Sequence, residues 1–166
     1  MCDNYSVEPI EPPTAHLGIP MTVLKENLEK AFSLPPAAVE WLVNLYDVLQ
    51  VFDDYADGDP VTREDLDATI WNTLVGMPAN PFFAQNAGAL LPAMSLLILK
   101  WQASNKVERE GKADEKSFVW RAGYYDVMLL VVQIVHGTAA AHKVAHHVMN
   151  FYAESYEDYK KEFLNG

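Results

Sequence analysis

One stretch of the chain, residues 115–136, constrains the fold most because its large apolar side chains surround a helix on all sides. At helical spacing these side chains point in different directions and do not form a single stripe. A helix that is apolar on all sides is usually buried among other helices. The sequence therefore predicts a central helix that ends before Gly137, with apolar residues Phe118, Trp120, Tyr124, Val127, Leu130, Val131 and Ile134.

Prolines, glycines and capping residues divide the rest of the chain into amphipathic segments. Asn80-Pro81 is a strong helix start, and Thr62 with Asp65 forms a short capping box. Gly58 and Pro60 are predicted to end the second helix, and Gly76 and Pro78 the third. No segment alternates apolar and polar residues as a half-buried strand does. We expect an all-α, single-domain bundle of about six helices. They would cover about 21–32, 36–57, 62–75, 81–103, 115–136 and 138–163.

Two apolar stretches predict how their helices pack. Leu66, Ile70 and Leu74 recur at helical spacing and form the stripe of the third helix. The longest apolar run, from Ala87 to Leu99, is shorter than the roughly 20 residues that span a bilayer. We therefore expect it to form a buried helix.

The first twenty residues contain Pro9, Pro12, Pro13 and Pro20. Proline at this density removes backbone donors and fixes φ, so residues 1–20 are predicted to be an extended arm. The arm is either a frayed tail or a segment that grips a neighbouring subunit. The bundle domain would then cover residues 21–166.

The balance of charge indicates which partners suit the chain. The 23 acidic and 12 basic residues give a formal net charge of −11. Nucleic-acid phosphates and acidic membrane surfaces repel such a chain, whereas basic protein surfaces attract it. Alternatively, the negative charge only keeps the protein soluble. Cys2 is the only cysteine and no secretory signal is visible, so a cytoplasmic protein is expected.

The end of the second predicted helix carries the sharpest candidate site, a cluster of carboxylates. Asp53 and Asp57 are one helical turn apart, and Asp54 lies beside them. Carboxylate oxygens are the ligands that Mg²⁺ prefers, and a bound Mg²⁺ stabilises charge on a leaving phosphate. The alternative is a solvated acidic surface.

The stretch from Gln50 to Asp57 resembles the second aspartate-rich motif of the isoprenoid (prenyl) synthases, which are also all-helical. The resemblance implies aspartates that bind a diphosphate through Mg²⁺. It covers about eight residues, and the chain has no second motif of the DDxxD type to face it.

Two further groups of residues are candidates. Asp126 is the one carboxylate within the apolar body of the 115–136 segment, so it is either a catalytic residue or a buried polar link between helices. Lys100, Arg121 and a tyrosine hydroxyl are its candidate partners. His142 and His146 are spaced to share a transition metal, or else are solvated.

These observations support two functional hypotheses. The first is an acidic helical binding protein that acts by protein–protein contact or self-association, without a cofactor. Tyr152, Tyr156 and Tyr159 suit an interface, or else pack within the protein. The alternative is a Mg²⁺-dependent enzyme acting on a phosphate or diphosphate compound through Asp53, Asp54 and Asp57, with Asp126 nearby.

Overall fold

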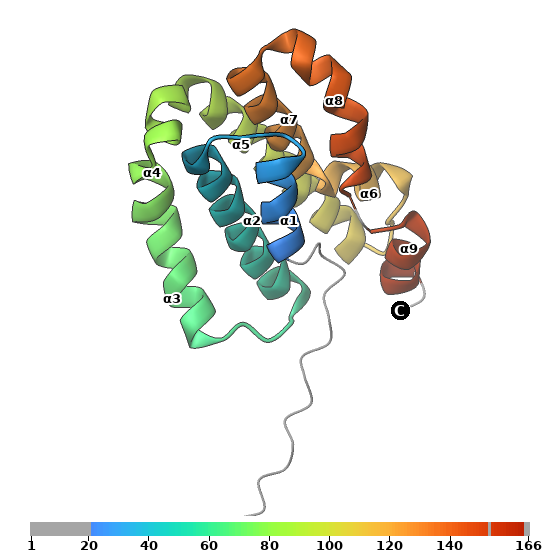
Figure 1. Ribbon diagram of the computed structural model, residues 1–166. Coiled ribbons are helices and arrows are strands. Elements are labelled where there is room, and N and C mark those ends of the chain that lie inside the picture. Colours follow the sequence, from blue (N-terminus) through green and yellow to red (C-terminus); the bar gives the residue numbers. More distant parts are fainter. Residues whose placement is uncertain (1–20, 153, 165–166) are drawn as a thin grey trace, which may run out of the picture.

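The computed structural model describes residues 21–152 and 154–164, and these form helices joined by short turns, with no strand (Figure 1). This confirms the all-α bundle. The predicted arm at residues 1–20 lies outside the described residues. The helices are α1 (Met21–Lys30), α2 (Pro36–Asp57), α3 (Arg63–Trp71), the π-helix η1 (Asn72–Gly76), α4 (Met77–Ala79), α5 (Pro81–Arg109), α6 (Glu115–Arg121), α7 (Gly123–His136), α8 (Thr138–Asn150) and α9 (Tyr156–Leu164).

The predicted capping residues begin and end several of these helices. Gly58, at φ +84°, ends α2 in the left-handed conformation, and the Thr62–Asp65 capping box begins α3. Asn80 Oδ1 accepts from the amides of Phe82 and Phe83 at the start of α5. Its Nδ2 also donates to the carbonyl of Ala37 at 3.0 Å, which ties the start of α5 to α2.

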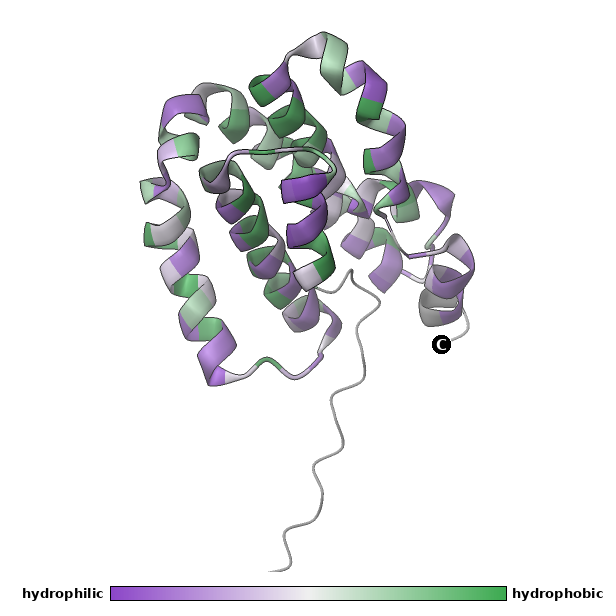
Figure 2. Ribbon diagram, in the orientation of Figure 1, coloured by the Kyte–Doolittle hydropathy of each residue, from purple (hydrophilic) through white to green (hydrophobic). Residues whose placement is uncertain are grey.

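Helices α2 and α7 supply much of the core, with α1 packed on α2. Figure 2 shows hydrophobic positions along α2 and α7 in the middle of the molecule. Side chains with at most 1% of their surface exposed include Leu24, Leu28, Trp41, Leu42, Leu90, Val127, Met128, Val131 and Val132. The prediction of a buried apolar helix is therefore confirmed for residues 123–136.

The single helix predicted at 115–136 is wrong in one respect, because α6 and α7 meet at Ala122 with a bend of 45°. The bend coincides with a close approach of α7 to α5. A Cβ on Gly123 would lie 3.3 Å from the backbone Cα of Leu97. In α6, Val119 and Trp120 are 59% and 49% exposed, so the buried part of this segment is α7.

The predicted helix at 138–163 is also two helices, since α8 ends at Asn150 and α9 begins at Tyr156. The break lets α9 turn onto α6, where Tyr159 is fully buried. Its ring lies 5.3 Å from that of Phe118.

Gly76 and Pro78 do not stop the third helix, contrary to the prediction, because the helical path continues through η1 and α4 to Ala79. In η1 the amide of Met77 donates to the carbonyl of Asn72, five residues back. Helices α3 and α4 form one edge of the molecule, and α9 lies at the opposite edge (Figure 1).

Helix α5 contacts α2, α4, α6 and α7, yet the expectation that its apolar run is buried is wrong. Leu91, Leu96 and Leu99 are 55–60% exposed. By length and composition α5 is the one described helix that could cross a membrane unaided, and α6 with α7 could do so as a bent pair. Only 11% of the most apolar stretch of α5 is buried, so α5 is not an ordinary core helix.

Candidate functional site

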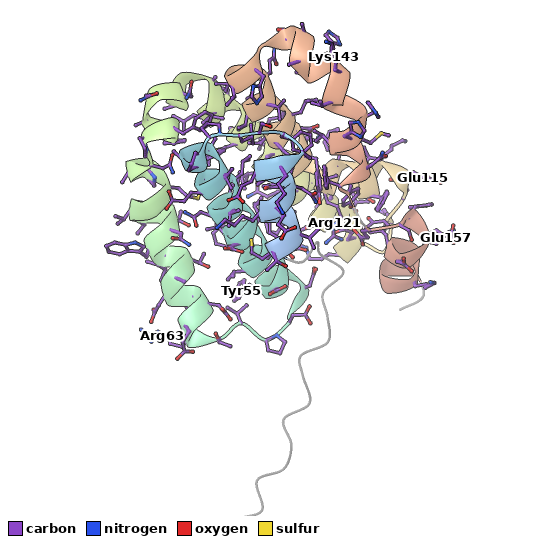
Figure 3. All side chains as sticks on the ribbon, viewed as in Figure 1. Tyr55, Arg63, Glu115, Arg121, Lys143 and Glu157 are labelled. Carbon is purple, nitrogen blue, oxygen red and sulfur yellow. The ribbon has the colours of Figure 1, made fainter. Side chains whose placement is uncertain are left out.

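A buried arginine, Arg121, lies at the centre of a cluster of acidic side chains where α2, α5 and α6 meet. Its guanidinium contacts Asp53 at 3.1 Å, Glu108 at 3.4 Å and Asp57 at 3.9 Å. The Arg121 side chain is 10% exposed and that of Glu108 is 3% exposed. Figure 3 shows Arg121 inside the molecule, whereas Arg63 lies at the outer end of α3. We call Arg121, Asp53, Asp57 and Glu108 the ion cluster.

The protonation of the ion cluster follows from its burial. Burial raises the pKa of Glu108 above its ordinary value, and this effect outweighs the opposing influence of the Arg121 charge and the Tyr159 hydrogen bond. Burial alone would lower the pKa of Arg121, but Asp53 and Glu108 raise it, so the guanidinium stays charged.

Neutral side chains complete the hydrogen bonding of the cluster. Trp101 Nε1 donates to Asp53 at 2.8 Å, and the Tyr159 hydroxyl donates to Glu108 at 2.8 Å. Ser117 also bonds the Tyr159 hydroxyl. The cluster therefore joins α2, α5, α6 and α9, and these contacts hold the four helices together.

The structure brings two of the three predicted metal ligands together around a cation of the protein itself. Asp53 and Asp57 both contact Arg121. The backbone carbonyl of Asp54 accepts from the amides of Gly58 and Asp59, which closes the end of α2. Among the described residues, no group of three or more histidine, cysteine, aspartate or glutamate side chains is placed to hold a metal ion.

Asp126 links two helices at the surface, and not in the interior as the alternative of a buried polar link expected. Its carboxylate pairs with Lys100 of α5 at 2.5 Å, and the Asp126 side chain is 68% exposed. Arg121, another candidate partner, is instead in the ion cluster. A surface pair of this kind contributes little stability, about 0–1 kcal/mol.

One hollow opens beside the ion cluster. It has a volume of about 200 Å³ and is lined by Ala56, Asp57, Asn105, Glu108 and Arg109. Pockets for small organic ligands usually measure about 300–1,000 Å³ and are mainly apolar. Asp126 is not among the lining residues, so the hollow does not combine the two predicted carboxylate sites.

The three candidate tyrosines pack within the protein. Tyr159 is buried, and the rings of Tyr152 and Tyr156 lie 5.0 and 5.6 Å from Phe118. They therefore dock α9 and the segment after α8 onto α6, the second of the two roles predicted for them. His142 and His146 are both exposed on α8, and the ring of His146 lies 3.8 Å from that of His147.

The sequence-based predictions missed a long uncharged segment that the structure leaves partly exposed. No charged residue occurs between Asp67 and Lys100. On α5 the exposed residues of this segment include Gly88, Leu91, Pro92, Ser95, Leu96 and Leu99, which we call the α5 face. The available signal was the absence of charge over this whole segment. A helix surface exposed to solvent usually carries charges, so an exposed surface without them indicates an interaction site.

Neither a protein family model, nor a curated protein, nor a solved structure matches this chain significantly.

Proposed function

We propose that this protein acts by protein–protein contact without catalysis, and that the α5 face binds a second copy of the chain. The supporting observation is the exposure of Leu91, Leu96 and Leu99 on an uncharged surface of a helix that the bundle holds in place. Exposed apolar patches of this kind mark interaction sites.

A second copy suits the α5 face for an electrostatic reason. Two chains with a net charge of −11 repel each other over most of their surface. The α5 face carries no charge, so two copies meet there without opposing like charges directly. Added salt screens the remaining repulsion over a Debye length of about 10 Å at 0.1 M. Self-association should therefore strengthen as salt is added.

The exposed area sets the expected affinity. Full burial of a leucine side chain contributes about 1.5–3 kcal/mol, so each half-exposed leucine contributes about 1 kcal/mol. Three leucines from each of two copies give roughly 6 kcal/mol, and an association cost of at least 4 kcal/mol leaves at most about 2 kcal/mol. The dimer should therefore be weak, with a Kd on the order of tens of millimolar, and should be sought at the highest soluble concentration, several millimolar protein.

Light scattering after size exclusion, at rising protein and salt concentrations, tests the proposal. The measured mass should rise from 18.6 kDa toward twice that value, and Leu96→Glu should abolish the rise. Gln102→Glu adds the same charge at an exposed position of α5 outside the α5 face, so it should leave the dimer intact.

Two outcomes would contradict the proposal. In the first, the wild-type protein stays monomeric at 18.6 kDa throughout. In the second, the monomer floats with neutral lipid vesicles and Leu96→Glu prevents flotation, which would assign the α5 face to a membrane.

A further inference from the structure

Helix α3 exposes almost its whole surface, including its apolar residues. Thr69 is its one buried side chain. The exposed apolar residues are Leu66 (45%), Ile70 (49%) and Trp71 (63%) on α3, and Leu74 (70%) and Val75 (41%) on η1. We call these five residues the α3 face. The predicted stripe of Leu66, Ile70 and Leu74 therefore faces solvent.

The backbone of η1 is an independent sign that this face has a role. A five-residue π-helix is rare, and π-turns inserted in α-helices occur frequently at functional sites. Leu74 and Val75 lie within this turn and are both exposed.

The charge beside the α3 face defines the partner. Residues 59–67 contain four acidic side chains, Asp59, Glu64, Asp65 and Asp67, and a single basic one, Arg63. Arg63 pairs with Asp67 at 2.9 Å. The apolar turns of the α3 face thus continue directly into an acidic first turn, so a partner needs apolar side chains along one stripe and basic side chains at one end.

We propose that the α3 face and its acidic first turn bind a basic amphipathic helix of another protein. An amphipathic helix seats leucines at positions i, i+4 and i+7 on an apolar surface, and its lysines or arginines then lie against the acidic turn. Charge complementarity speeds association and selects basic over acidic partners. This surface differs from the α5 face, so either proposal can fail alone.

Three synthetic helical peptides of 18 residues test the proposal. The first places leucine along one face and lysine at one end of that face, the second replaces lysine with glutamate, and the third scrambles the first. Fluorescence anisotropy of labelled peptide measures Kd at low and high salt. The basic amphipathic peptide should bind, more weakly at high salt, and the other two should bind at least about tenfold more weakly.

Variants assign the site on the protein. Ile70→Ser with Leu74→Ser should raise Kd at least about tenfold while far-UV circular dichroism stays unchanged, because both side chains are exposed. The matched control, Leu91→Ser with Leu96→Ser, removes similar apolar surface from α5 and should leave Kd unchanged. Emission of Trp71, obtained as the difference between wild type and Trp71→Phe, should shift to the blue on binding.

The proposal is overturned if no peptide binds, if the acidic or scrambled peptide binds as well as the basic one, or if the α5 control weakens binding as much. It is also overturned if Ile70→Ser with Leu74→Ser abolishes self-association of the wild-type chain, because a second copy would then occupy the α3 face.

Discussion

Replacement of Arg121 by methionine tests the role assigned to the ion cluster. Methionine fills similar space but leaves Glu108 and Asp53 without their cation. Removal of one partner of a buried ion pair usually costs about 3–5 kcal/mol. Asp53 and Asp57 are 28% and 25% exposed, and Glu108 keeps the Tyr159 hydroxyl, so we expect a loss of about 3 kcal/mol. For a chain of this size, Tm should fall by roughly 6–12 °C.

The loss should depend on pH because Glu108 can take up a proton. Without Arg121 the pKa of Glu108 rises further above its ordinary value of 4.5. The native state then binds more protons than the unfolded chain above pH 4.5, so the free energy of unfolding falls as pH rises through that window. The destabilisation caused by Arg121→Met should therefore be larger at pH 8 than at pH 5.

Urea unfolding followed by circular dichroism measures both effects. Arg63→Met is the matched control, because Arg63 also pairs with an aspartate, but that pair is on the surface and its side chains are 79% and 56% exposed. It should cost under about 0.5 kcal/mol. The double variant Arg121→Met, Glu108→Gln should recover about 1–2 kcal/mol, because glutamine removes the buried charge.

The reasoning is refuted if Arg121→Met costs under about 1 kcal/mol at both pH values. An equal loss at pH 5 and pH 8 would show that Glu108 is not the residue left uncompensated.

The remaining predictions concern helix packing and metal binding. Gly123→Ala should destabilise the protein by about 1–3 kcal/mol in the same urea assay, since the new Cβ meets the backbone of Leu97 and α5 must move away. Alanine at Gly88, where a Cβ meets nothing within 4 Å, should not destabilise it. Millimolar Mg²⁺ should leave Tm unchanged in wild type and in Asp54→Asn, because the Arg121 guanidinium already contacts both Asp53 and Asp57, where a metal ion would have to bind. A rise specific to Mg²⁺ that Asp54→Asn abolishes would support the alternative of a magnesium-dependent enzyme.

Local sequence signals predicted the starts and ends of helices, because caps act within a few residues. Gly58, Thr62 with Asp65, and Asn80 each perform the predicted role. The break at Ala122 was not predictable in this way, since it accompanies the contact between Gly123 and Leu97 of another helix. Tertiary contacts between distant residues leave no local pattern.

The candidate site, like the fold, could be predicted only where local spacing determines the structure. Spacing predicted that Asp53 and Asp57 share a helix side, but their partner Arg121 is more than sixty positions away and could not be assigned from the sequence. The burial of residues 87–99 was predicted wrongly because apolar composition shows that a segment favours burial, not which chain supplies the cover.

The last described helix, α9, has a consequence for any shortened form of the protein. The Tyr159 hydroxyl meets Glu108, fifty-one positions earlier in the sequence, and its ring lies beneath the Arg121 guanidinium, 5.7 Å away. Deletion of α9 would admit water to the acidic interior between α5 and α6. A truncation there should therefore be treated as a core mutation, even though it removes only the tail of the sequence.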